Sequence, residues 1–330
     1  MITRRALVGS ALATPFVMAA SRYSFANDWP QAGPIRLVVA SGAGGNADVV
    51  TRIVAAELET ALGQSFVVEN LSAASGMQAT EAVSRADPDG YTFLVGTSSQ
   101  LVHNIALFDP LPVDITTTLR GVAMMNEVPM VMCVNNDDPA GSLEDFIARL
   151  RAAPEDFQYG SGPTGTTTHI TGALFLSELG LDIVHVPYPK SGEALRDLIA
   201  GRLSFVFNPS LTAVPQVRDG AVRGLGVSAP ERLVAMPDLP TVSEAGLPGF
   251  VSQTWNTFAA PAGTQEEIVV RLNEAVNTIV QSDAIRSQLV DLGSIVPPSK
   301  TPQEVDAYYA RQREIWIPVV RGTGATRSAG

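Results

Sequence analysis

The sequence predicts an α/β fold with two domains, in which parallel-rich sheets are flanked by helices. Apolar runs typical of buried strands alternate with stretches that have the apolar spacing of helices. The length of 330 residues corresponds to about two domains at roughly 150 residues each. The composition agrees, because 45% hydrophobic and 17% charged residues permit a sizeable core and argue against disorder.

The start of the chain, residues 1–26, has the pattern of a signal peptide. A short basic segment, Met1–Arg5, precedes the apolar run Ala6–Ala20, and Ser24–Ala26 fits the small-x-small cleavage rule. We expect cleavage near Ala26 and export to the periplasm, by the Sec pathway or, given the adjacent arginine pair, by the twin-arginine pathway. The apolar run is too short to span a membrane, so we expect a mature protein that is not membrane-embedded.

The mature chain opens with strands and helices in the order β-α-β-α-β. Ile35–Ala40 is an apolar run that ends in glycines and predicts a buried strand, and Asn46–Leu62 has the apolar spacing of a helix that Gly63 ends. The remaining elements of this segment are strand Phe66–Glu69, helix Gly76–Arg85 and strand Tyr91–Gly96. This order implies a parallel sheet with right-handed crossovers.

The middle of the chain repeats the alternation. The predicted elements are helix Ser142–Ala152, strand Phe157–Ser161, helix Thr166–Leu179, strand Ile183–Val186, helix Gly192–Ala200, and strands Leu203–Asn208 and Val222–Ser228. The proline-rich segment Ala229–Pro248 predicts a long loop, and helices are expected at Gln265–Gln281, Ala284–Leu292 and Pro302–Val320. We expect one domain to combine residues 27–127 with 229–330 and the other to span 128–228. The crossings between them are expected near Val128–Val134 and Val222–Ser228.

The charge balance excludes some classes of partner. The net charge is -11, and without residues 1–26, which carry three arginines and no acid, it is 19 basic minus 33 acidic side chains, or -14. Nucleic acid and anionic lipid both need basic patches, so neither is expected as a partner. The single cysteine, Cys133, lies in a strand-like run and predicts a core residue, and three histidines leave little for a structural zinc site. We expect no cofactor and no metal.

Two small-residue loops each follow a predicted strand and open a predicted helix. They are Ser41–Asn46 and Gly160–Thr167. Exposed backbone N–H groups and a helix N-terminus together can bind an anion without a cationic side chain, and such loops lie at the carboxyl ends of strands, where ligands bind. Two such loops, one per domain, can close on one anion. The candidate ligand-binding residues are Ser41, Gly42, Ala43, Gly44, Gly45, Asn46, Thr97, Ser98, Ser99, Ser161, Gly162, Thr164, Gly165, Thr166, Thr167, His169, Tyr188 and Asn208.

Other interpretations of these loops stay open. Gly42-x-Gly44-x-x-Ala47 is a relaxed dinucleotide fingerprint, and Glu69 lies about where a ribose-binding acid belongs, which favours an exported NAD(P)-dependent oxidoreductase. A hydrolase would use Ser161 or Ser98 with His169, but the Gly-x-Ser-x-Gly elbow is absent. Turn packing and helix capping by Thr166 explain the loops without any ligand. Scattered aspartates are interpreted as solvated turn residues; these are Asp87, Asp89, Asp109 and Asp114.

An ordered set of motifs resembles the Bug family of periplasmic solute-binding proteins, the receptors of tripartite tricarboxylate transporters. The matching pieces, in chain order, are Trp29-Pro30, Ile35-Arg36-Leu37-Val38-Val39, Ala43-Gly44-Gly45 with Asp48 and Arg52, Leu62-Gly63-Gln64, Val67-Val68-Glu69-Asn70, Pro88-Asp89-Gly90-Tyr91-Thr92, Tyr159-Gly160-Ser161, Gly165-Thr166 with His169, His185-Val186-Pro187-Tyr188, Pro240-Thr241 with Glu244-Ala245-Gly246, and Ala260-Pro261-Ala262-Gly263-Thr264. One piece alone is weak, but the ordered set is specific.

The resemblance implies a two-domain Venus-flytrap fold of the periplasmic-binding-protein type. It implies a monomeric receptor without catalytic chemistry that delivers a small organic carboxylate to membrane transporter subunits. The two loops would hold the carboxylate through backbone donors, hydroxyls and ordered water. A sensor that uses the same flytrap for signalling is an alternative.

The sequence departs from the family pattern at three places. Ala40-Ser41 replaces the usual proline and aromatic residue before the first loop, Asn70–Gly76 differs from the usual glycine-rich segment, and Asn104-Ile105 replaces Asn-Pro. Loss of the aromatic residue opens the pocket or makes it more polar.

Overall fold

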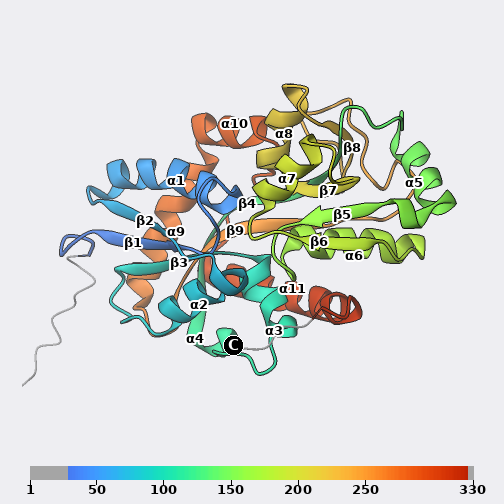
Figure 1. The fold of residues 1–330 in the computed structure, drawn as a ribbon. Helices are drawn as coiled ribbons and strands as arrows, with labels where there is room; N and C mark the ends of the chain where they lie inside the picture. Colours follow the sequence, from blue (N-terminus) through green and yellow to red (C-terminus); the bar gives the residue numbers. More distant parts are fainter. Residues whose placement is uncertain (1–28, 326–330) are drawn as a thin grey trace, which may run out of the picture.

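The computed structural model describes residues 29–325 (Figure 1). The predicted signal peptide therefore lies outside the described residues. The strands pair in the order β2-β1-β3-β9-β4-β7-β5-β6, with β8 added beside β4. This α/β architecture with flanking helices confirms the predicted fold class.

The first half of the structure is the sheet β2-β1-β3-β9 with the beginning of β4. Its strands are β1 (Ile35–Val39), β2 (Phe66–Asn70), β3 (Thr92–Thr97), β9 (Gln253–Pro261) and β4 (Leu119–Val134). Its longer helices are α1 (Asn46–Leu62), α2 (Met77–Ser84), α9 (Glu266–Gln281), α10 (Asp283–Asp291) and α11 (Pro302–Gly322). Short helical segments lie at Ala73–Gly76, Ser99–His103, Asn104–Leu107 (α3) and Ile115–Thr118 (α4). Strand β1 is parallel to β2 and β3, as predicted, whereas β9 is antiparallel to β3 and β4.

The second half contains the end of β4 and the strands that follow it. These are β5 (Gln158–Ser161), β6 (Val184–Pro187), β7 (Phe205–Pro209) and β8 (Arg223–Val227), with helices α5 (Leu143–Ala152), α6 (Thr167–Leu179), α7 (Ser191–Ile199) and α8 (Ser210–Arg218) and a short turn of helix at Pro154–Asp156. Strands β5, β6 and β7 are parallel, and β7 and β8 each pair antiparallel to β4.

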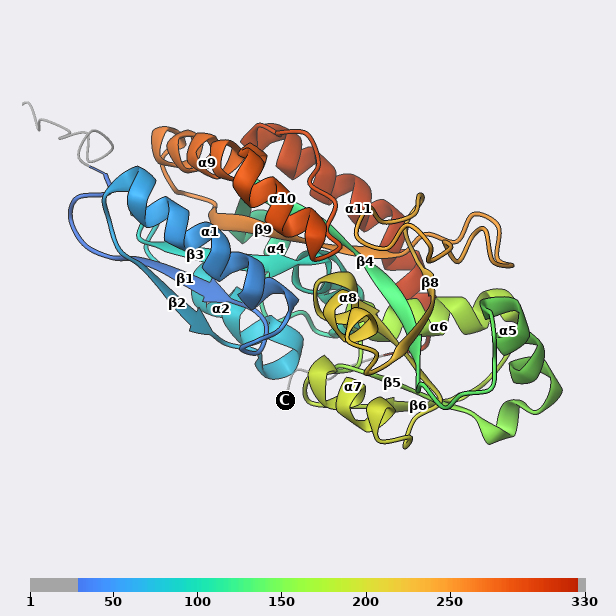
Figure 2. The same ribbon diagram turned by 90° about the horizontal axis from the view of Figure 1, so that it is seen from above.

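Strand β4 joins the two halves. Its residues up to Pro129 pair with β9, and those from Met130 pair with β7, so the strand changes partner between these two residues. Figure 2 shows β4 running from the group of strands β1–β3 toward β5 and β6. The sequence predicted only its second part as a strand, at the expected crossing.

Apolar side chains alternate between the two faces of each sheet, because both faces are covered by helices. In β1, Leu37 belongs to the cluster under α1 and α9, and Val38 belongs to the cluster under α2 and α11. In β4, Met132 packs toward α5 and α6, and Cys133 packs toward α7 and α8. Cys133 is fully buried, which confirms its prediction as a core residue.

The predicted loop after β8 packs against the second half. Leu233 and Leu239 join the cluster with Cys133, and Val242 and Phe250 join the cluster with Met132. These contacts keep the segment on the second half as far as Ser252, whose N–H donates to Ser228 O at 2.9 Å.

Within residues 29–325, we find no helix with the length and apolar character needed to cross a bilayer.

Candidate binding site

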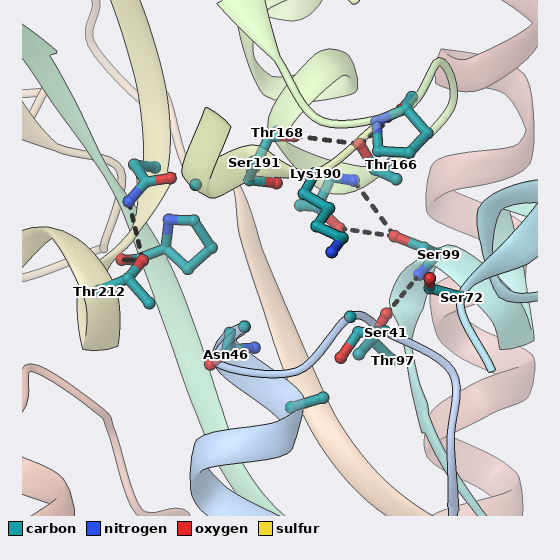
Figure 3. A pocket seen from close by; sticks show the side chains of 18 of the residues that line it. Ser41, Asn46, Ser72, Thr97, Ser99, Thr166, Thr168, Lys190, Ser191 and Thr212 are labelled. Atoms are coloured by element: carbon teal, nitrogen blue, oxygen red, sulfur yellow. Dashed lines mark hydrogen bonds between the residues drawn. The ribbon is translucent and has the colours of Figure 1, made fainter. Parts of the chain in front are cut away.

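A cavity of about 460 Å³ lies where both halves present the carboxyl ends of their parallel strands (Figure 3). The first half contributes the loop 40–47, together with Ser72, Ser75 and the polar residues after β3. The second half contributes the segments that open α6, α7 and α8. One cavity therefore collects polar groups from widely separated parts of the chain.

Four helices begin at this cavity. The residues that precede α1, α6, α7 and α8 are Gly45, Thr166, Lys190 and Pro209, and all four line the cavity. None of these four residues caps its helix with its own side chain. Helix N-termini carry N–H donors and a partial positive charge, so their convergence favours an anion.

The buried carboxylate of Asp48 holds the first loop in place. Asp48 Oδ2 accepts the Gly44 N–H at 2.8 Å, and Asp48 Oδ1 lies 2.9 Å from Arg52 Nη2. Asn70 Nδ2 donates to Asp48 Oδ1 and to Ser41 O, both at 3.0 Å. Burial opposes ionisation of Asp48, but the hydrogen bonds from Arg52, Gly44 and Asn70 outweigh it and lower the pKa of this carboxyl. The Gly45 N–H also donates to Gly42 O at 3.1 Å, so the N–H groups of Gly44 and Gly45 both hold the loop in shape.

The second loop uses its hydroxyls internally. Thr166 Oγ1 donates to Pro163 O at 2.7 Å and lies 3.0 Å from Thr168 Oγ1, which accepts the Gly162 N–H at 3.0 Å. Most of these hydroxyls are therefore committed to the loop itself.

Thr167 links the second loop to the first half. Its hydroxyl lies 2.9 Å from Ser98 Oγ, and its N–H donates to Ser99 Oγ at 3.2 Å. The residues after β3 thus touch the start of α6 across the cavity wall.

All three histidines of the chain gather behind the second loop. The Gly165 N–H donates to His169 Nδ1 at 3.1 Å, and the Gly165 carbonyl lies 3.2 Å from His103 Nδ1. His185 stacks on His169 with ring centroids 4.2 Å apart, and its Nε2 lies 2.7 Å from Ser161 Oγ. Burial lowers the pKa of each of the three rings to about 4, so the rings are neutral at neutral pH.

The structure places eleven of the candidate residues on the cavity lining. They are Ser41, Gly42, Ala43, Gly44, Gly45, Asn46, Thr97, Ser99, Thr166, Thr167 and Asn208. Seven lie outside the lining: Ser98, Ser161, Gly162, Thr164, Gly165, His169 and Tyr188. Tyr188, for example, donates its hydroxyl to Asp197 at 2.8 Å.

The sequence reasoning missed the contribution of the segment between β6 and α7. It expected an anion site without a cationic side chain, but Lys190 and Arg196 both line the cavity, together with Glu193. The turn at Pro189 carries Lys190 to the first loop, where a β-carbon built on Gly42 would lie 3.5–3.7 Å from the Lys190 stem. Lys190 is one of two lysines in the chain and directly precedes a helix. These two features could have indicated a cationic side chain at the site.

The positions of Glu69 and Ser161 do not favour the dinucleotide-binding or hydrolase interpretations. Glu69 pairs with Arg36 at 2.6 Å, outside the cavity lining, and not with a nucleotide-binding loop. Ser161 contacts His185 and not His169, and it is 2% exposed and outside the lining. Two of the scattered aspartates bond their own turns, as expected, since Asp89 accepts the Tyr91 N–H and Asp114 accepts the Thr116 N–H.

Comparison with known proteins decides the family. Residues 50–324 match the family described as "Tripartite tricarboxylate transporter family receptor". The chain belongs to this family. A curated relative of the receptor is BugT of Bordetella pertussis (strain Tohama I), which is 32% identical over 97% of each chain.

Solved structures resemble the receptor closely. An R. palustris protein solved with adipate has a TM-score of 0.86 and 33% identity, over 90% of this chain and 99% of that one. MatC from Rhodopseudomonas palustris, solved with bound malate, has a TM-score of 0.81 and 31% identity, over 87% and 99%. The periplasmic binding protein BugD has a TM-score of 0.83 and 25% identity, over 89% and 99%.

Proposed function

We propose that the receptor captures a small organic carboxylate in the cavity between its two halves and delivers it to the membrane subunits of a tripartite transporter. The observation that carries this proposal is the convergence of four helix N-termini on one cavity, because such N-termini favour negatively charged groups. Two related proteins solved with the dicarboxylates adipate and malate support the same ligand class.

The proposal assigns binding to the part of the candidate set that lines the cavity. The loop 41–46 supplies backbone donors, and Thr97, Ser99, Thr166, Thr167 and Asn208 surround the ligand. The residues behind the second loop hold that loop in place and do not touch the ligand. The role is binding and release without a chemical step, since the Ser161–His185 pair is buried away from the cavity.

The two halves serve as the two domains of a flytrap. Contacts to one half exist whether the cavity is open or closed, but contacts to the other half form fully only on closure, so a ligand that touches both favours the closed state. The proposed working unit is a monomer. The protein acts in the periplasm after export by its signal peptide.

Ligand identification tests this function. Mass spectrometry of ligand released from native protein should find a small carboxylate, and a thermal-shift screen should show stabilisation by mono- or dicarboxylates. Saturation at 100 times the Kd adds about 2.7 kcal/mol to stability. Stabilisation by sugars alone would refute the proposed ligand class, and bound nicotinamide, seen by its absorbance or fluorescence, would favour the oxidoreductase alternative.

A further inference from the structure

Lys190 carries the unbalanced charge of the cavity. Three ionisable side chains line the cavity: Lys190, Glu193 and Arg196. Glu193 and Arg196 form a pair, with Oε1 and Nη2 4.0 Å apart. Among residues 29–325, no carboxylate forms an ion pair with Lys190. A protein with a net charge of -11 therefore lines its cavity with a net charge of +1.

The position of Lys190 directs this charge to the ligand. The residue directly precedes α7 in the second half, and its stem lies beside Gly42 of the first loop. Figure 3 shows the side chain extended into the middle of the cavity, on the side of Ser41. The ammonium thus reaches from one half of the protein toward the anion-binding loop of the other.

Uncharged donors can already hold one carboxylate in this cavity. The N-termini of α1, α6 and α8 present backbone N–H groups, and hydroxyls surround them. Neutral donors respond to the geometry of a carboxylate group and not to the total charge of the ligand. An ammonium is a compact, flexible point charge, and its attraction grows with the negative charge it meets.

We propose that Lys190 is a specificity-determining residue that pairs with a second carboxylate, so that the cavity selects dicarboxylates over monocarboxylates of the same length. This inference rests on the proposed function, because it assumes that the cavity binds organic carboxylates. It assigns the first carboxylate to the uncharged donors and the second to the ammonium.

Matched ligands and matched variants test the role of Lys190. We suggest calorimetric titration with adipate against hexanoate, and with succinate against butyrate, because each pair differs by one carboxylate at constant chain length. The variants are Lys190→Met, which keeps the stem without the charge, and Lys190→Arg, which keeps the charge. Lys300→Met is the control, since Lys300 is the chain's other lysine and lies over the Tyr308 ring, outside the cavity lining.

Lys190→Met should weaken dicarboxylate binding about 10- to 100-fold, the range for removing a charged hydrogen-bond partner, and monocarboxylate binding about threefold or less. Lys190→Arg should keep most of the selectivity, and Lys300→Met should match the wild type. Dicarboxylate binding to the wild type should weaken with added salt more steeply than binding to Lys190→Met. Lys190 is exposed, so the variant should fold normally, which circular dichroism checks.

Two outcomes would overturn the inference in distinguishable ways. If the wild type binds carboxylates and Lys190→Met keeps the same ratio of dicarboxylate to monocarboxylate affinity, the assignment of Lys190 fails and the proposed function stands. If the wild type binds no carboxylate of either class, the proposed function and the assignment fail together.

Discussion

The two loops at the cavity look alike in the sequence but differ in how they are held. The first loop, 41–46, contains three glycines, and Asp48, Arg52 and Asn70 anchor it from behind. In the second loop, 160–167, threonine hydroxyls bond within the loop, and the loop packs on the buried His103 and His169 and the half-buried His185. A count of donors in a sequence therefore overestimates what a loop offers, because donors engaged in holding the loop are lost to the ligand.

Alanine at a glycine in each loop gives the largest expected contrast. Gly165 has a φ of 84°, and a β-carbon there would lie 2.3 Å from Leu107 Cδ2. Gly44 has a φ of 74°, and nothing lies within 4 Å of its β-carbon position. Gly165→Ala should cost about 2–4 kcal/mol of stability, from left-handed strain plus overpacking, and Gly44→Ala about 1–2 kcal/mol, from strain alone. Urea unfolding measures both, and equal losses would contradict the difference in packing.

Acid should weaken the second loop before the first. Burial holds the pKa of His169 at about 4 against an ordinary value of 6.5. Below pH 6.5 the unfolded chain binds a proton at this ring that the folded protein does not. The contribution of this ring to the free energy of unfolding is therefore fully present above about pH 6.5 and is lost as the pH drops toward 4. Each such ring contributes about 2 kcal/mol of loss at pH 5.

The variant His169→Asn isolates this effect, because its amide oxygen can still accept the Gly165 N–H. Between pH 7.5 and pH 5, the free energy of unfolding should fall by about 2 kcal/mol less for this variant than for the wild type. Parallel declines in the two proteins would show that His169 does not sense acid.

The anchor of the first loop should matter for stability and for binding. Asp48→Asn removes the charge that pairs with Arg52 and should cost about 1–2 kcal/mol, with weaker carboxylate binding because the loop is less fixed. The matched control is Glu81→Gln on α2, since Glu81 also pairs with an arginine four residues later, but that arginine is 66% exposed and the acid 27%. The control should change stability by about 0.5 kcal/mol or less. A similar cost for both variants would argue against an anchoring role for Asp48.

The smallest effect is expected at Ser161, behind the second loop. Ser161→Ala removes the hydroxyl that contacts His185 and should cost about 1 kcal/mol of stability. Carboxylate affinity should stay within about twofold, because Ser161 lies outside the cavity lining. Loss of a direct hydrogen bond to the ligand would instead cost about 1–3 kcal/mol of binding free energy. Thr166→Ala, on the lining, should reduce affinity more. A larger binding loss at Ser161 would place the ligand deeper than the cavity.

Local patterns in the sequence predicted most of the second half and the start of the first. Strand β1 and helix α1 follow from an apolar run, a glycine-rich turn and helical spacing, and their bounds agree with the structure to within one residue. Helix α8 was not predicted, because it is short and contains Pro215. Strand β9 was missed because its partners β3 and β4 come more than a hundred residues earlier, and pairing at that distance leaves no local signal.

The cavity lining was predictable only at the two loops. The first loop lines the cavity throughout, as its glycines suggested. The roles of Ser161 and His169 depend on which way a side chain points after the loop has folded, and residue types do not determine that. Lys190 reaches the cavity through the turn at Pro189 and the approach of two halves, which are tertiary features.

The place of β9 in the sheet also constrains the order in which the protein can fold. This strand lies between β3 and β4, yet among residues 29–325 it is the last strand to be synthesised. The strands β5 to β8 of the second half are all present once Val227 has been made, whereas the place between β3 and β4 in the first sheet stays empty until Pro261 has been added. Pairing over such separations is slow because loop-closure entropy is lost before the contacts form. We therefore expect the second half to acquire structure early. The first half, which contains both described chain ends, should fold last.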